Sequence, residues 1–158
     1  MSMNAVEIEF PNLACTKYQI TSPQDKKYNC IASAANDNEK FWWPIGGYWP
    51  PNVPRTETLD AFIRAYSTMG YSPCKNGSRE MGFEKVAIYA DSNNKPKHAA
   101  RQIGKDMWTS KLGRNIDISH ELKGLEGISY GKSVLFLKRP SPGMRKVISK
   151  LSFLFGRK

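Results

Sequence analysis

Hydrophobic and polar positions repeat with two different periods along the chain, and the longer period marks the predicted helices. Between residues 56 and 69 the apolar positions fall on one helical face: Leu59, Phe62, Ile63, Tyr66 and Met69. Thr56 is placed to cap this stretch, and Gly70 is placed to end it. The pattern predicts a helix over residues 56–69.

A second, shorter helix is predicted to begin at Cys30. Loop-forming residues occupy positions 22–25, and an Asn-Asp-Asn run at 36–38 breaks the pattern that follows. Between them Ile31, Ala34 and Ala35 share one face at helical spacing. The cysteine therefore stands at the first position of a buried helix.

The second half of the chain changes to the shorter period that is typical of strands. It contains four strand-like runs, at residues 83–89, 97–103, 107–112 and 133–137. The first three are expected to form an antiparallel meander, and Asp117 is expected to cap a short helix ending at Leu122. Residues 6–10 also alternate like a strand, whereas residues 71–78 read as a loop. Together these elements predict an α+β fold, with the cysteine helix packed on a small antiparallel sheet.

One segment of unusual composition interrupts the helical half at residues 41–51. Its proline and glycine content excludes regular structure, and five of its first nine residues are aromatic. Large amphipathic side chains on loops often line binding sites, so the candidates for substrate contact are Trp42, Trp43, Tyr48 and Trp49. The alternative is that these rings cap the core.

Charge separates the chain into a body and a tail. Seven cations and no acidic residue follow residue 137, which leaves about +3 of the formal net charge of +10 for the rest. Within the tail, apolar residues from Met144 to Leu154 recur at helical spacing. We expect one domain over residues 1–140 and a basic amphipathic tail over 141–158. The tail is suited to an anionic membrane surface, a protein partner, nucleic acid or docking on its own domain.

Composition removes several classes of protein. Three widely spaced cysteines, an odd number, do not make a disulfide framework, and two histidines without a Cys-x-x-Cys pair give no zinc pattern. No other cofactor is indicated. The first residues lack the pattern of a signal peptide, and no apolar run has transmembrane length. The sequence therefore predicts a soluble, cytoplasmic chain.

The candidate chemistry centres on Cys30. Free backbone N–H groups and the helix dipole stabilise a thiolate at a helix start, which would lower the thiol pKa and make the sulfur a nucleophile. Cys15 and Cys74 have no such position. A core cysteine is the alternative interpretation. A thiolate mechanism also needs a proton acceptor, and His98, at the start of a predicted strand, fits that role better than His120.

The segments Tyr28-Asn29-Cys30-Ile31-Ala32 and Lys97-His98-Ala99-Ala100-Arg101-Gln102 resemble the papain-like cysteine hydrolases, in particular their small bacterial amidases and peptidases. In that superfamily a cysteine opens an early helix and a histidine follows at a strand start. The resemblance implies a papain-like fold over about residues 20–137.

The same resemblance implies a third polar residue that orients the histidine. Ser110 and Asp117 are both candidates, and we favour Asp117 because a carboxylate also stabilises an imidazolium. Gln24 stands six residues before the cysteine, the spacing of the oxyanion-hole glutamine in papain, although the backbone N–H of Cys30 is the better expected donor.

Two functions follow as hypotheses. The first is a cysteine-dependent peptidase or amidase that cleaves an amide or related acyl bond of a peptide-like substrate through Cys30, His98 and Asp117. The second is a non-catalytic binding module, in which the aromatic loop 41–51 and the basic tail hold a peptide, an anionic lipid surface or nucleic acid. A hydrogen bond between the sulfur and the imidazole favours the enzyme, and separate burial of the two groups favours the module.

Overall fold

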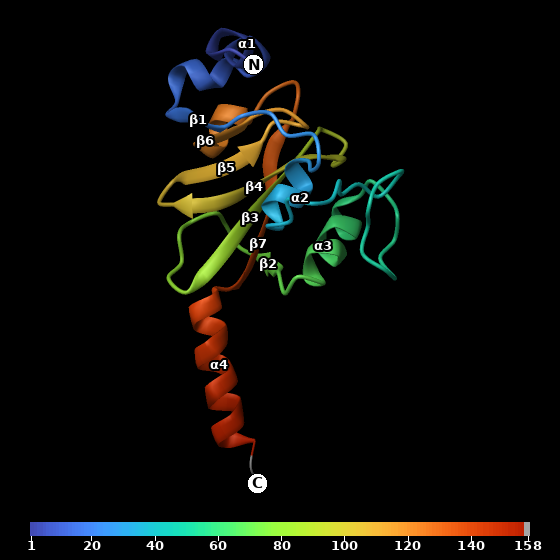
Figure 1. The fold of residues 1–158 in the computed structure, drawn as a ribbon, viewed down its shortest axis with the longest axis vertical. Coiled ribbons are helices and arrows are strands. Elements are labelled where there is room, and N and C mark those ends of the chain that lie inside the picture. Colours follow the sequence, from blue (N-terminus) through green and yellow to red (C-terminus); the bar gives the residue numbers. More distant parts are fainter. Residues whose placement is uncertain (157–158) are drawn as a thin grey trace.

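The computed structural model describes residues 1–156, which are built around one antiparallel sheet of seven strands in the order β1-β6-β5-β4-β3-β7-β2 (Figure 1). The strands are β1 (Tyr18–Ser22), β2 (Ser72–Cys74), β3 (Phe83–Ala90), β4 (Pro96–Gly104), β5 (Met107–Lys111), β6 (Asp117–His120) and β7 (Lys132–Pro140). The helices are α1 (Met3–Glu9), α2 (Cys30–Ala34), α3 (Leu59–Ser67) and α4 (Pro142–Phe155), with 3-10 turns η1 (Pro11–Cys15) and η2 (Leu122–Leu125). The predicted α+β class is confirmed.

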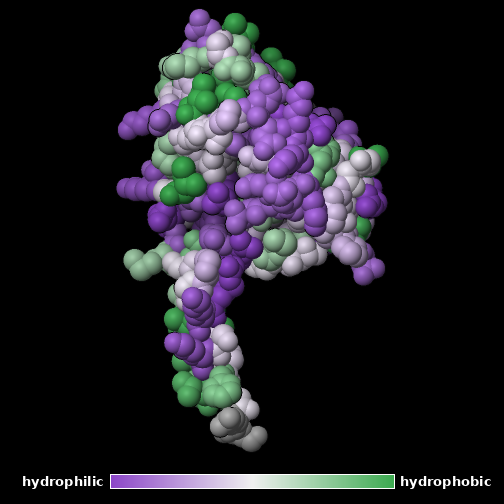
Figure 2. All heavy atoms as spheres, viewed as in Figure 1, coloured by the Kyte–Doolittle hydropathy of each residue, from purple (hydrophilic) through white to green (hydrophobic). Residues whose placement is uncertain are grey.

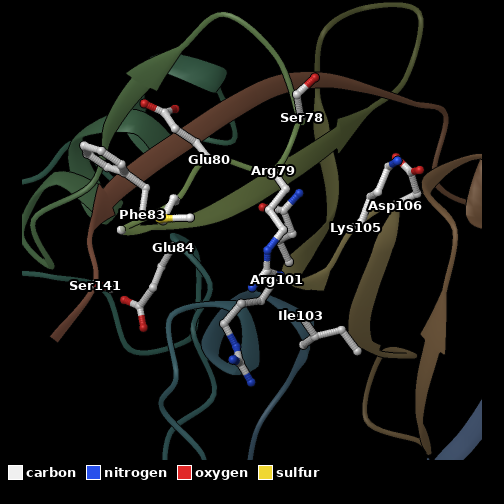
Figure 3. A pocket seen from close by; sticks show the side chains of 13 residues that line it. Ser78, Arg79, Glu80, Phe83, Glu84, Arg101, Ile103, Lys105, Asp106 and Ser141 are labelled. Atoms are coloured by element: carbon white, nitrogen blue, oxygen red, sulfur yellow. The ribbon is translucent and has the colours of Figure 1, made fainter. Parts of the chain in front are cut away.

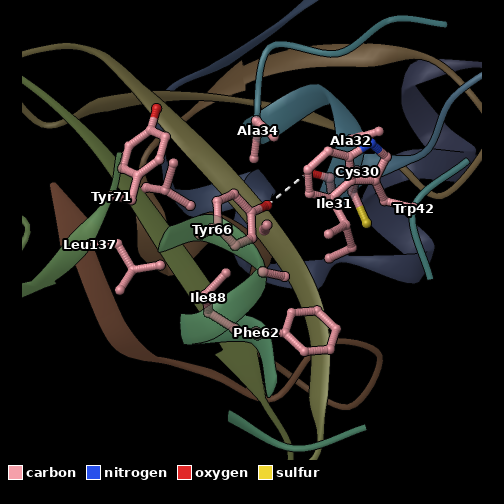
Figure 4. Packing of buried hydrophobic residues seen from close by; sticks show 14 of the residues in the cluster. Cys30, Ile31, Ala32, Ala34, Trp42, Phe62, Tyr66, Tyr71, Ile88 and Leu137 are labelled. Atoms are coloured by element: carbon pink, nitrogen blue, oxygen red, sulfur yellow. Dashed lines mark hydrogen bonds between the residues drawn. The ribbon is translucent and has the colours of Figure 1, made fainter. Parts of the chain in front are cut away.

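The sheet separates two hydrophobic clusters. On one face α2, α3 and the aromatic loop cover Ile88, Ala99 and Leu137 (Figure 4). On the other face α1, η1 and η2 cover the alternate strand residues, which include Tyr89 and Trp108. Successive side chains of a strand point to opposite faces, so neighbouring residues of β4 serve different clusters.

The predicted meander is confirmed, since β3, β4 and β5 are consecutive neighbours in the sheet. The meander continues into β6, where a short helix capped by Asp117 was expected. That expectation is wrong, because Asp117–His120 pairs with β5 on one side and with β1 on the other. Only Leu122–Leu125, just beyond the strand, is helical. The backbone hydrogen bonds of two flanking strands decide this segment, and one of them, β1, comes from far earlier in the chain.

The strand expected at residues 6–10 is a helix instead. Ser2 caps α1 by accepting a hydrogen bond from the N–H of Ala5 at 3.4 Å. Val6 and Phe10 are buried one helical turn apart, while Ile8 is largely exposed. The alternating pattern was misleading because Ile8 does not belong to the core.

Three further features differ from what the sequence pattern predicts. Thr58 rather than Thr56 caps α3, since its hydroxyl accepts from the N–H of Ala61. The expected loop 71–78 contains the short edge strand β2, which pairs with β7. The strand β1 had no clear signal of its own.

The basic tail forms α4, a helix of 14 residues that begins after Ser141 and extends away from the body (Figure 1). The last two tail residues, 157 and 158, lie outside the described part. Among residues 1–156 no helix has the length and apolar character needed to cross a membrane.

Candidate active site

Cys30 is the first residue of α2, as the sequence predicts, and Asn29 is its N-cap. The Asn29 side chain accepts from the N–H of Ala32 at 3.3 Å and also binds both backbone groups of Trp42, at 3.0 and 2.7 Å. One buried amide therefore holds the start of the helix against the aromatic loop. Tyr66 secures the same turn from α3 by donating its hydroxyl to the Ile31 carbonyl at 2.7 Å (Figure 4).

The Cys30 thiol is buried, with 6% of the residue exposed. Burial raises the pKa of the Cys30 thiol to about 11, although the backbone N–H groups of Ala99, Ile31 and Cys30 itself oppose this increase. The expected lowering by the helix start is thus outweighed by desolvation. The resting residue is a neutral thiol, surrounded by amides that would stabilise negative charge once it forms.

His98 lies on β4 directly before Ala99 and is completely buried. It faces Tyr89 across the strand pair, on the side of the sheet that carries the second cluster, whereas Cys30 belongs to the first. Burial holds the pKa of His98 well below its usual value, so the ring is neutral. Neither ring nitrogen has a hydrogen-bond partner among the described residues, and none joins the ring to the Cys30 sulfur.

Tyr130 connects the surroundings of these two residues. Its ring stacks on the His98 ring, with centroids 4.0 Å apart and planes 7° from parallel. Burial raises the pKa of Tyr130, and negative charge on Cys30 raises it further, so the hydroxyl lies within electrostatic range of the sulfur. Tyr130 also lines a cavity of about 250 Å³ together with Gln24 and Gly113. The tyrosine ring therefore stands between this cavity and the buried imidazole.

The residue expected to orient His98 has another partner. Asp117 accepts a hydrogen bond from the Tyr28 hydroxyl at 3.0 Å. The pKa of Tyr28 is raised to about 12, mainly by burial and to a smaller extent by the Asp117 carboxylate. Lys111 completes the group, with its Nζ 4.2 Å from the centre of the Tyr28 ring and 2.7 Å from the Asn115 carbonyl oxygen. A fully buried lysine near the start of α2 was not anticipated from the sequence.

Ser110, the other candidate for orienting His98, binds His120 instead. Its hydroxyl lies 2.7 Å from Nε2 of His120, and Nδ1 lies 2.8 Å from the Glu121 carbonyl oxygen. Because a carbonyl can only accept, Nδ1 donates and Nε2 accepts from the serine. His120 is thus a neutral, fully paired structural residue.

The aromatic loop is mainly a cover for α3. Trp42 and Trp49 are buried, and the indole N–H groups of Trp42, Trp43 and Trp49 donate to Asp37, Glu57 and the Pro54 carbonyl respectively. Tyr48 alone among the four candidate contact residues is substantially exposed, with the Lys40 ammonium 4.2 Å from its ring centre. The buried rings are not available to a ligand in this structure.

A separate groove lies beside the start of α4. It is lined by the loop 78–84, the hairpin 101–106 and Ser141, and its side chains include Arg79, Arg101 and Lys105 (Figure 3). Residues 1–156 contain no group of three or more His, Cys, Asp or Glu side chains that could hold a metal ion.

The comparison with protein families found one matching family. A model described as Domain of unknown function (DUF7689) matches residues 19–138. The chain belongs to this family. The DUF7689 region runs from β1 to β7 and contains Cys30, His98 and Tyr130, whereas α1 and α4 lie outside it. No curated protein and no solved structure matches the chain, so the resemblance to papain-like hydrolases stays a prediction.

Sequence reasoning missed two residues of the candidate site, Tyr130 and Lys111. The available signal for Tyr130 was its position between Gly127 and Gly131, which pair with each other and form a tight loop. The sequence carried no clear signal for Lys111, which ends a strand of mixed apolar and polar residues.

Proposed function

We propose that this protein is a cysteine-dependent hydrolase of papain-like type that cleaves an amide or related acyl bond. The observation that carries the proposal is His98, a completely buried imidazole with both nitrogens unpaired, next to the residue whose N–H approaches the Cys30 sulfur. An unpaired buried polar group costs about 1–3 kcal/mol, and such groups are retained where function requires them.

The chemistry follows from the groups present. Cys30 and His98 are buried on different faces of the sheet with no hydrogen bond between them, the arrangement expected of the binding module, so the hydrolase requires a rearranged state in which one water molecule contacts both groups. In that state His98 takes the thiol proton of Cys30 through the water, and the thiolate attacks the carbonyl carbon of the substrate. The backbone N–H of Cys30 stabilises the oxyanion, and the imidazolium then donates its proton to the leaving amine. Water activated by neutral His98 hydrolyses the thioester, which releases the acid and restores the thiol.

Substrate access is through the cavity that Gln24 and Tyr130 line. In the resting structure Tyr130 covers His98, so it has to move before a peptide-like substrate and the relaying water can enter. Asp117, which binds Tyr28, positions the loop before Cys30 rather than the imidazole.

The test is covalent labelling of the full chain with a peptidyl acyloxymethyl ketone, a probe that alkylates activated cysteines, followed by peptide mapping. We expect labelling at Cys30, and we expect its loss in His98→Leu with the fold retained by circular dichroism. Tyr130→Ala should label faster, whereas Tyr48→Ala, on the aromatic loop, should label like the unmodified protein.

Two results would contradict the proposal. One is modification confined to the more accessible Cys15 and Cys74 in both the unmodified chain and Tyr130→Ala. The other is Cys30 labelling that is unchanged in His98→Leu, which would return Cys30 to the core and favour a non-catalytic module.

A further inference from the structure

The C-terminal helix α4 leaves a large apolar surface uncovered. None of its residues is buried, and Val147, Ile148, Leu151, Leu154 and Phe155 are between 45% and 80% exposed. These positions recur at three- and four-residue spacing and form one stripe along the helix. Figure 2 shows that the helix stands clear of the body, with apolar and polar side chains both facing outward. The sequence-based alternative that α4 docks on its own domain is therefore wrong.

The opposite side of α4 carries the cations of the helix together with two serines and Phe153. Arg145, Lys146 and Lys150 flank the apolar stripe, and the helix has no acidic residue. At 14 residues it is about 21 Å long, too short to span a bilayer and long enough to lie in its interface.

The attachment of α4 extends the same surface onto the body. Met144, at the start of the apolar stripe, packs against Gly82, and the neighbouring Met81 is almost fully exposed. Arg79 and Lys105 line the groove beside it (Figure 3). Neither has an ion-pair partner among residues 1–156. Three acidic residues, Glu80, Glu84 and Asp106, line the same groove, so its charge is mixed and the surface without acidic residues is that of α4 itself.

We propose that α4 and the adjoining loop bind an anionic lipid surface, with the apolar stripe in the acyl boundary and the cations at the headgroups. Charge complementarity selects this occupant. A second copy of the helix would bring three cations against three without an acidic partner, and nucleic acid would leave the apolar stripe in water. This surface is independent of Cys30 and of the proposed hydrolase activity.

The experiment is co-sedimentation of the full chain with phosphatidylcholine vesicles that contain phosphatidylserine, and with phosphatidylcholine alone. We expect binding to the anionic vesicles that weakens as salt rises. Each cation near such a surface contributes about fivefold, so Lys146→Gln with Lys150→Gln should weaken binding by about 30-fold. Leu151→Gln with Leu154→Gln should abolish it.

Matched controls come from exposed positions on the body. Lys26→Gln with Lys27→Gln removes the same charge, and Ile128→Gln removes an exposed apolar side chain. Neither should change vesicle binding by more than about twofold, because surface changes at sites distant from the interface have small effects.

Three outcomes would overturn the proposal. The first is equal binding to both vesicle types that the lysine variant does not weaken. The second is a lack of vesicle binding together with a dimer in ultracentrifugation that the leucine variant dissociates. The third is a lack of vesicle binding together with retardation of an RNA oligonucleotide. The second would identify another copy of the chain as the occupant, and the third would identify nucleic acid.

Discussion

At the scale of single residues, the two histidines offer a direct comparison. Both are completely buried on the same side of the sheet, and burial lowers the pKa of each. His120 has a partner at each nitrogen, Ser110 and the Glu121 carbonyl, whereas His98 has none among the described residues. A buried polar residue is expected to be paired, so the contrast is the reason that the proposed function rests on His98 and not on His120.

Replacing each histidine by leucine should separate these roles. His120→Leu leaves the Ser110 hydroxyl and the Glu121 carbonyl unpaired, so we expect the free energy of unfolding to fall by about 2–4 kcal/mol. His98→Leu removes two unpaired nitrogens and loses ring stacking on Tyr130, and these effects should cancel to within about 1 kcal/mol. Urea denaturation measures both. A loss in His98→Leu as large as that in His120→Leu would contradict this reasoning.

The same residues predict acid sensitivity. Burial lowers the pKa of His120 to about 4 from its usual 6.5, so the unfolded chain gains the proton first as pH falls. The native state keeps its full stability above pH 6.5 and loses it as pH falls toward 4, by about 3 kcal/mol from this residue. Denaturation at about pH 7 and about pH 4 tests this, with His120→Leu expected to show a smaller difference between the two values. An equal pH dependence in that variant would exclude His120 as the cause.

At the scale of elements, the loop between η2 and β7 carries Tyr130, whose ring covers His98. Gly127 and Gly131 exchange backbone hydrogen bonds of 2.9 and 2.8 Å, and this pairing closes the loop that carries Tyr130. Gly131 has a φ of +74°, and a Cβ atom there would lie 1.9 Å from the Ala90 carbonyl oxygen. Only glycine fits at this point.

Gly131→Ala should therefore displace the loop or destabilise the protein. We expect the free energy of unfolding to fall by about 3 kcal/mol or more, and Cys30 to be alkylated faster as Tyr130 leaves His98. Gly143→Ala is the control, because it meets no atom within 4 Å and improves helix propensity. Thermal unfolding and iodoacetamide labelling report the two effects. Unchanged stability together with unchanged labelling would show that the loop is not constrained at Gly131.

At the scale of the whole molecule, the body and α4 are joined by one turn of helix. Ser141 donates its N–H to the Gly82 carbonyl at 2.8 Å, and the Arg145 guanidinium lies 3.8 Å from the Glu84 carboxylate. Beyond this turn the helix has no buried side chain. The stability of the body should not depend on it.

Deletion of the chain from Pro142 onward tests this separation. We expect cooperative unfolding with a free energy within about 1 kcal/mol of the full chain, since only surface contacts are lost. Binding to anionic vesicles should disappear, while labelling of Cys30 by the ketone probe should persist. Unfolding of the shortened chain would show that the Met144 contact with Gly82 belongs to the core.

The sequence alone determined the elements whose signals are local. The Cys30 helix, the central strands and the amphipathic tail follow from side-chain period, breakers and charge, which act within a few residues. Whether Asp117–His120 is helix or strand was decided by pairing with the preceding strand β5 and with β1, which comes from far earlier in the chain. The alternation at residues 6–10 misled for the same reason, because only packing determines that Ile8 faces solvent.

The candidate site divides in the same way. Sequence predicted that Cys30 begins a helix and that His98 lies on a strand, and both placements are confirmed, but the ionisation of the thiol depends on desolvation, which is a property of the assembled core. The partners of Asp117 and Ser110, and the stacking of Tyr130 on His98, depend on which strands become neighbours. Tertiary structure therefore decided which polar groups are paired and which are left without a partner among the described residues.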